Sequence, residues 1–448
     1  MFMPSDGADV DLILENAAVY TPTGLVTASV GIRDGKIVVI AGGAQGGNAK
    51  RVDLKDKLIL PGVIDCHVHV REPGQTQKED FFTVSQAAAY GGVTCIMCMP
   101  NTIPRVESIK IFDEVVEMGE SKSLIDFCLQ AAINYDRLND MQELQERGAV
   151  SFEIIDEELS KTQLLSIMKA VESTGIPLGM AACDFQLFKE LSQQKNGFPE
   201  SRDGGHLDHW PPLVETMGIA KASVLSSETG TKVHLRQVSS GQGIMLAGAL
   251  KKWNKTLTLE VGPHHLFLTH ACLKDLGPYG VVLPPLRAFD DQSALWKAIT
   301  EGTVDAVASD HAPHSPWEKE ERKGDFHRVP PGIAGIEVML PLMLNAVNEK
   351  KISLSTLVSV MSENPARIFG LYPKKGAIQV GSDADLVVVA MERIWSLDGK
   401  TRYSKAGRIP YAGMTGKGVP VLTLSRGRVV MHDRCASEDP GGGRFVTP

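Results

Sequence analysis

The sequence predicts an α/β protein, a (β/α)8 barrel with a small β-sandwich domain built from both ends of the chain. Three observations lead to this fold class. Apolar strand-like runs alternate with helical patterns about eight times between residues 58 and 375. Both ends of the chain instead show short strands with glycine-marked turns. Two apolar runs end in polar side chains, as strands of a barrel do at its active face.

The two ends of the chain share one pattern. Residues 9–57 contain alternating segments joined at Asp34-Gly35, a dipeptide typical of a tight hairpin turn. Residues 376–448 again show short strands separated by glycine-marked turns. We therefore expect residues 1–57 and 376–448 to form one composite sandwich domain beside a barrel of residues 58–375.

The barrel elements are predicted in chain order after a first strand that ends at His67. Further strands are expected at Val93–Met99, Phe127–Ala132, Ala149–Ile155, Pro177–Ala182, Lys232–Val238, Thr256–Val261 and Val304–Ser309. Helices are expected at Ile109–Met118, Leu164–Ser173, Leu213–Thr229 and Leu246–Trp253. Cys95 and Cys98 lie inside an apolar strand, which favours core packing over a redox or metal pair.

Two strand ends carry candidate metal ligands. His67 and His69 are separated by one residue, so on a strand both imidazoles share a face and can bind one ion. Asp310 follows another apolar run and offers a carboxylate that can ligate a metal or transfer a proton. Packed core histidines and a helix-capping aspartate are the structural alternatives.

Composition excludes several classes of protein. The 448 residues carry a net charge of −8, which gives no basic footprint for nucleic acid. No window predicts a membrane-spanning helix, and no secretory signal is apparent at the N-terminus. Seven cysteines without a regular framework fit a reducing compartment, so we expect a cytoplasmic protein.

Several motifs together resemble dihydroorotase, within the cyclic amidohydrolases that include allantoinase and hydantoinase. They are HVHVREPG from His67, MPNT from Met99, EVGPHHLFLTH from Glu260, SDHAPH from Ser309 and PPGIAGIE from Pro330. The resemblance implies opening or closing of a cyclic amide in a metal-containing barrel. It implies His67 and His69 as metal ligands, and Asp310 as a ligand and as the catalytic acid and base.

The same resemblance implies a clamp for a substrate carboxylate, made by Arg71, Asn101 and His314. A planar guanidinium and neutral donors suit that task. Alternatives remain open for each residue. Arg71 could pair with Glu79 or Asp80, Asn101 could be a turn residue, and His314 could be an ordinary loop histidine.

Three positions depart from the family's metal set. Glu153 stands where the family has a carboxylated lysine that bridges two metals, and Ala181 and Gln237 stand where it has histidines. We therefore expect one divalent ion, most simply Zn²⁺. The Glu153 carboxylate is ~3–4 Å shorter in reach than a carboxylated lysine, so either its strand shifts inward or it does not touch the metal. His206 and His209 could replace the lost ligands from a loop.

Two functions are consistent with these features. The first is a dihydroorotase-like enzyme acting on a small cyclic amide or carbamoyl amino acid, or on allantoin or a hydantoin. The second is an inactive scaffold subunit that supports a transcarbamoylase. Leu283 and Trp210 indicate an altered pocket, and residues 315–328 form a charged segment that could cover it. The family resemblance implies a homo-oligomer.

Overall fold

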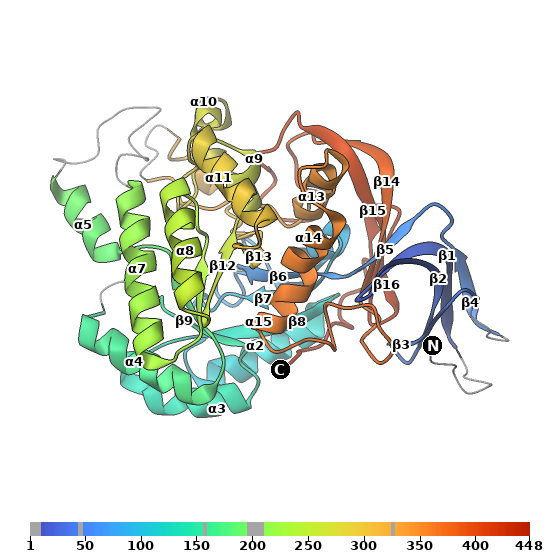
Figure 1. Cartoon of the computed structure of the whole chain (residues 1–448), viewed down its shortest axis with the longest axis horizontal. Coiled ribbons are helices and arrows are strands. Elements are labelled where there is room, and N and C mark those ends of the chain that lie inside the picture. Colours follow the sequence, from blue (N-terminus) through green and yellow to red (C-terminus); the bar gives the residue numbers. More distant parts are fainter. Residues whose placement is uncertain (1–9, 44–47, 156–158, 195–209, 324–327) are drawn as a thin grey trace.

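The computed structural model describes residues 10–43, 48–155, 159–194, 210–323 and 328–448. Its larger part is an eight-stranded parallel sheet in strictly sequential order from β6 to β13 (Figure 1). The strands are β6 (Val63–Val68), β7 (Val93–Cys98), β8 (Asp126–Ala132), β9 (Ser151–Glu153), β10 (Leu178–Ala181), β11 (Val233–Arg236), β12 (Leu257–Val261) and β13 (Ala306–Val307). A parallel bridge between Val68 and His311 closes the sheet into a ring. The predicted (β/α)8 barrel is confirmed.

Helices cover the outside of this ring (Figure 1). The longer ones are α1 (Phe81–Gly91), α2 (Ile109–Lys122), α4 (Lys161–Thr174), α5 (Phe185–Gln194), α7 (Pro212–Thr229), α8 (Gly241–Trp253), α11 (Phe289–Thr300) and α13 (Met339–Asn348). Shorter helices are α3 (Met141–Glu146), α9 (Pro263–Phe267), α10 (Leu273–Leu276), α12 (Pro316–Glu320), α14 (Leu354–Val358) and α15 (Asn364–Ile368). None of the described helices is long and apolar enough to cross a membrane.

Local sequence explains where these helices begin and end. The Asp80 side chain accepts a hydrogen bond from the Thr83 amide and forms a capping box at the start of α1. Gly92 then ends α1 with a left-handed backbone, φ 85°. Barrel strands such as β7 are buried along their whole length, because strands and helices cover both faces of the ring. Cys95 and Cys98 are buried within β7, which confirms their core role.

The two chain ends form a separate nine-stranded sheet (Figure 1). Its strands are β1 (Leu12–Thr21), β2 (Gly24–Arg33), β3 (Lys36–Ala41), β4 (Lys50–Asp53), β5 (Leu58–Pro61), β14 (Leu386–Ser396), β15 (Thr415–Ser425), β16 (Arg428–His432) and β17 (Cys435–Ala436). The predicted hairpin at Asp34-Gly35 joins β2 to β3, and both residues have positive φ. Strand pairing between the chain ends gives the predicted composite β-sandwich.

The chain passes from the terminal sheet into the barrel later than residue 58, where the boundary was predicted. Strand β5 pairs in parallel with β1 and antiparallel with β14, so Leu58–Pro61 belongs to the terminal sheet. Gly62 separates β5 from β6, and the barrel pairing begins at Val63. The apolar run from Leu58 to Val68 is continuous, so its pattern alone does not mark the change of sheet.

Candidate active site

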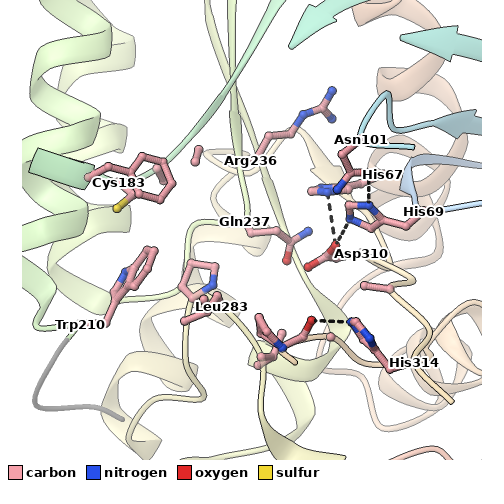
Figure 2. A pocket seen from close by; sticks show the side chains of 18 of the residues that line it. His67, His69, Asn101, Cys183, Trp210, Arg236, Gln237, Leu283, Asp310 and His314 are labelled. Atoms are coloured by element: carbon pink, nitrogen blue, oxygen red, sulfur yellow. Dashed lines mark hydrogen bonds and ion pairs between the residues drawn. The ribbon is translucent and has the colours of Figure 1, made fainter. Parts of the chain in front are cut away.

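A pocket of about 410 Å³ opens at the carboxyl ends of the barrel strands, the end where such barrels place their active residues. Figure 2 shows it with His67, His69 and Asp310 on one wall and Cys183 and Trp210 on the opposite wall. Its remaining lining includes Arg71, Asn101, Ala181, Phe185, Arg236, Gln237, Leu283 and His314. The structure therefore brings all of the predicted site residues except Glu153 to one cavity.

His67, His69 and Asp310 form the centre of the polar wall. Asp310 Oδ1 lies 3.3 Å from His67 Nε2 and 3.0 Å from His69 Nε2. Their ligand atoms all fall within 4.8 Å of one another, close enough to share a cation. His67 lies at the end of β6, His69 follows it, and Asp310 comes three residues after β13. The spacing of the motifs predicted this convergence.

The other nitrogen of each imidazole is held by a neighbouring acceptor. His67 Nδ1 lies 2.5 Å from Glu260 Oε1, and His69 Nδ1 lies 2.9 Å from Asn101 Oδ1. With a cation bound between the rings and Asp310, each Nδ1 would donate to its acceptor and each Nε2 would present its lone pair to the cation. Such outer hydrogen bonds fix the tautomer and orientation of metal-binding histidines. The donor set of two imidazoles and one carboxylate thus fits a divalent cation.

The ionisable side chains of this wall shift one another's pKa values. Burial opposes a charge on His67, but Asp310 and Glu260 outweigh it and raise the pKa of His67 to about 9. Burial also opposes ionisation of Asp310, yet His67 and His69 lower the pKa of that carboxyl group to about 2. Burial lowers the pKa of His69. The wall therefore holds an ionised carboxylate that attracts positive charge.

Arg71 and His314 lie together at the edge of this wall. Arg71 Nη2 is 3.3 Å from His314 Nε2, and Arg71 Nε donates to the Pro313 carbonyl oxygen at 3.3 Å. Burial and the nearby Arg71 lower the pKa of His314 to about 3, so this imidazole is neutral. Among the described residues, no carboxylate forms an ion pair with Arg71.

The alternative roles proposed for Arg71 do not hold. Glu79 accepts from Ser404 Oγ at 2.5 Å, and Asp80 pairs with Lys405 at 2.5 Å. Both carboxylates are thus occupied elsewhere. Arg71 instead faces the pocket with a buried guanidinium, 9% exposed. Such a group is available to a ligand carboxylate.

Three pocket residues have left-handed backbones, which are uncommon outside glycine. The φ angles are 66° at Arg71, 50° at Gln237 and 46° at Asp310. Backbone strain of this kind concentrates at functional sites, where the surrounding structure holds it. Each of these residues lies just beyond a strand end, so the turn aims its side chain into the pocket.

The wall opposite the histidines is apolar. Phe185 and Phe188 pack against Trp210, with ring centroids 6.1 Å and 4.8 Å apart. Leu283, whose position was noted as altered, is 36% exposed and lies on the Trp210 side of the pocket (Figure 2). The indole Nε1 of Trp210 is buried without a hydrogen-bond partner among the described residues. The pocket thus combines a cation-attracting end with an apolar end.

Glu153 binds a residue that was not among the predicted site residues. Arg236, at the end of β11, directs its guanidinium to both Glu153 oxygens, Nη2 to Oε1 and Nε to Oε2, the second at 3.3 Å. Ser151 Oγ also donates to Glu153 Oε1 at 3.1 Å. Glu153 is absent from the group formed by His67, His69 and Asp310. The geometry does not support the predicted metal role of Glu153, because its oxygens are already satisfied by the guanidinium.

The structure also shows the surroundings of the other two positions that depart from the family's metal set. Ala181 lines the pocket without a ligand atom, and Gln237 Nε2 donates to Glu260 Oε1 at 2.9 Å. Gln237 Oε1 is buried without a partner among the described residues. His206 and His209, proposed as replacement ligands, lie outside the described residues. Within the predicted cover segment, Pro316–Glu320 is the helix α12, tied to Lys78 by Glu318 at 3.0 Å.

One signal in the sequence marks Arg236. It stands in the strand run VHLRQVSS, where an apolar residue is expected and a buried charge requires a partner. Finding that partner needs the three-dimensional register. Glu153 and Glu260 come from β9 and β12, and both reach the same guanidinium across the barrel.

Comparison with known proteins assigns most of the chain to one family model. The model described as the amidohydrolase family matches residues 58–430. The dihydroorotase of Methanothermobacter thermautotrophicus is 34% identical over 439 residues, which cover 97% of each chain. The L-hydantoinase of Paenarthrobacter aurescens is 30% identical, with 98% of each chain covered.

Solved structures show the same architecture. An L-hydantoinase from Arthrobacter aurescens superposes with a TM-score of 0.93 at 30% identity, covering 98% of this chain and 100% of that one. A D-hydantoinase superposes with a TM-score of 0.89 at 28% identity, covering 97% of this chain and 98% of that one. The similarity extends over both the barrel and the terminal sheet.

Proposed function

Because this chain belongs to the amidohydrolase family, we propose that it is a metal-dependent enzyme that hydrolyses or closes a cyclic amide, with interconversion of N-carbamoyl-L-aspartate and dihydroorotate as its main reaction. One observation carries the proposal. His67 and His69 converge on Asp310 in the same pocket that holds the buried guanidinium of Arg71. A cation site and a carboxylate-binding site thus face one small cavity.

The metal role rests on the donor set of this wall. His67, His69 and Asp310 would hold one divalent ion, and Zn²⁺ suits two imidazoles and a carboxylate. Such an ion acidifies water toward a pKa of ~7 and polarises a carbonyl group. Glu260 and Asn101 fix the two histidine rings through their Nδ1 atoms.

Asp310 is the proposed acid and base. Its carboxylate lies 3.3 Å from His67 Nε2 and 3.0 Å from His69 Nε2, beside the place where the ion would sit, and from there it would accept a proton from the attacking water. It then delivers that proton to the amide nitrogen as the C–N bond breaks. Ring closure follows the same steps in reverse, with the protonated carboxyl group of Asp310 as the acid.

The substrate carboxylate is proposed to bind Arg71. The guanidinium lies beside the neutral imidazole of His314, and both side chains line the pocket. Asn101 already uses its Oδ1 on His69, which leaves its amide N–H groups for the ligand. A ring amide with one acidic substituent would then span from Arg71 to Asp310.

A hydantoinase-like activity is the second candidate, favoured by the apolar wall. Phe185, Trp210 and Leu283 line the part of the pocket opposite the cation site. A cyclic amide with a bulky apolar substituent could place that substituent there. The named relatives and superposed structures include L- and D-hydantoinases. A hydantoin substituted with a benzyl group represents this class.

The experiment compares both substrate classes with the zinc-loaded full chain. Dihydroorotate, carbamoyl aspartate, hydantoin and 5-benzylhydantoin are each assayed for ring opening or closure. Turnover in the parent and a loss of at least ~10³-fold in Asp310→Asn is the expected result, because the variant lacks its proton carrier. Asp305→Asn is the matched control, since Asp305 pairs with Lys251 at the other end of the same run.

The outcomes separate the candidates. A preference for dihydroorotate supports the carboxylate clamp, and a preference for 5-benzylhydantoin supports the apolar wall. Equal activity of the parent and Asp310→Asn contradicts the role of Asp310. An absence of turnover on every ring contradicts the enzyme and leaves the scaffold role, which co-purification with a transcarbamoylase would test.

A further inference from the structure

The guanidinium of Arg236 lies inside the barrel, surrounded by side chains of the kinds that bind metal ions. Glu260 Oε2 is 2.9 Å from Arg236 Nη1, and Glu153 approaches from the other side. Around Glu260 Oε2, His234 Nε2 lies at 3.1 Å and Cys66 Sγ at 3.5 Å. The ligand atoms of Cys66, His234 and Glu260 fall within 4.8 Å of one another, a grouping compatible with a cation.

Every N–H of this guanidinium has an acceptor. Nε and Nη2 donate to Glu153, Nη1 donates to Glu260 and to the Cys66 carbonyl oxygen at 3.0 Å, and Nη2 also donates to Gln130 Oε1. The Arg236 side chain is 5% exposed, and the Glu260 side chain is fully buried. Burial lowers the pKa of Arg236, but Glu153 and Glu260 more than reverse this and raise it. The site therefore contains a permanent positive charge.

A second metal ion does not fit this chain as it stands. The bridging lysine of the resembled family is replaced by Glu153, and its two further histidines by Ala181 and Gln237. The carboxylate that remains is bound by Arg236. A divalent ion placed there would meet a like charge within a buried site.

We propose that the Arg236 guanidinium is a built-in substitute for the family's second metal ion, because it supplies the positive charge that balances Glu153 and at the same time binds Glu260. Glu260 is the link to the first site. Its Oε2 binds Arg236, while its Oε1 accepts from Gln237 Nε2 at 2.9 Å and lies 2.5 Å from His67 Nδ1, where it orients that ring. Arg236 is thus a positioning residue that acts through Glu260, and the inference holds whichever ring the enzyme opens.

The test measures how many zinc ions each protein binds. Full-length parent and Arg236→Ala are stripped with a chelator, reloaded with Zn²⁺ and analysed by elemental analysis after desalting. Removal of the guanidinium leaves two carboxylates, an imidazole and a thiol without a cation. We expect Arg236→Ala to bind about one equivalent more than the parent, and zinc to raise its melting temperature more than that of the parent.

Three control variants test whether the additional zinc binding depends on the loss of the positive charge of Arg236. Arg287→Ala removes another arginine whose side chain is 5% exposed and paired with a fully buried glutamate, Glu215, so it should not change the zinc content. Arg236→Lys keeps the charge and should bind as the parent does. Adding Glu153→Gln to Arg236→Ala should remove the extra equivalent. The measure is a difference, so a parent that binds no zinc would contradict the proposed first site, and the zinc content of Arg236→Ala relative to the parent would still decide this inference.

Two results would overturn the inference. One is an Arg236→Ala protein that folds and binds no more zinc than the parent. The other is failure of both Arg236→Ala and Arg236→His to fold when zinc is supplied during expression, because a substitute cation must be exchangeable for a metal. Restored folding of either variant by zinc alone supports the proposal.

Discussion

Among single residues, Lys319 occupies surroundings that strongly oppose its charge. It belongs to α12 next to the carboxylate clamp and is 3% exposed. Its Nζ donates to the Val281 carbonyl oxygen at 3.3 Å. Burial and then Arg71 lower its pKa from 10.5 to about 7, although Glu318 acts in the opposite direction. Its protonation is therefore linked to folding.

The free energy of unfolding should rise with pH because of Lys319. Between pH 7 and 10.5 the unfolded chain binds more protons at this residue than the folded chain does. Its contribution should increase by up to about 1.4 kcal/mol per pH unit in that window. Denaturant unfolding at pH 7, 8 and 9 should show this slope in the parent and a flatter dependence in Lys319→Met.

Lys323→Met provides the control for this slope, because Lys323 follows α12 with its side chain 69% exposed. Its pH dependence should match that of the parent. Parallel curves for the parent and Lys319→Met would contradict the linkage.

Single residues also show what the sequence could and could not predict about the site. Alternation on a strand and placement at a strand end were enough to predict that His67, His69 and Asp310 meet. Arg236 was missed because its partners come from other strands, and no local pattern reports the register across a barrel. Gln237 has a left-handed backbone beyond β11, so alternation of faces along a strand does not describe it.

At the scale of elements, one buried lysine joins the barrel to the terminal sheet. Lys375 Nζ contacts Asp126 of β8 at 2.7 Å, Asp385 at 2.5 Å and Asp383 at 3.3 Å. The lysine side chain is 1% exposed. Arg426 Nε adds a contact to Asp126 at 3.0 Å. These ion pairs fix the start of β8 beside the start of β14.

Lys375→Met should destabilise the protein by roughly 3–5 kcal/mol, because it leaves buried carboxylates without their main counter-charge. Chemical denaturation at neutral pH measures the loss. The neighbouring Lys374 is exposed, so Lys374→Met should change the free energy of unfolding by no more than ~0.5 kcal/mol. Equal stability of the two variants would show that the cluster contributes little.

Element boundaries were harder to predict than element types. The apolar run at Ala149–Ile155 does contain a strand, but β9 extends only from Ser151 to Glu153. Pairing with β8 and β10 sets those limits, and pairing is not visible in one segment. The same reason explains why β5 was assigned to the barrel while it pairs with the terminal sheet.

For the whole molecule, the last residues of the chain return to the barrel. Val446 N donates to the Phe127 carbonyl oxygen at 2.9 Å, and Phe127 N donates to the Arg444 carbonyl oxygen at 3.0 Å. The Phe445 ring lies 5.7 Å from that of Phe112 and 5.8 Å from that of Phe127. The C-terminal segment thus packs against β8 and α2, although the pattern of short strands and glycine-marked turns grouped it with the sandwich.

Removal of residues 444–448 should lower the free energy of unfolding by roughly 3 kcal/mol, because Val446 and Phe445 leave an apolar surface uncovered. Thermal unfolding should show a correspondingly lower midpoint. A chain ending at Val446 keeps these contacts and should melt close to the parent. A truncated protein as stable as the parent would show that the segment is dispensable.

The contact between Glu153 and Arg236 also bears on how the enzyme matures. A carboxylated lysine forms only after translation, by addition of carbon dioxide to the amine, whereas both side chains of this ion pair are encoded directly. The interior of this barrel can therefore complete itself as the polypeptide folds, independent of bicarbonate supply.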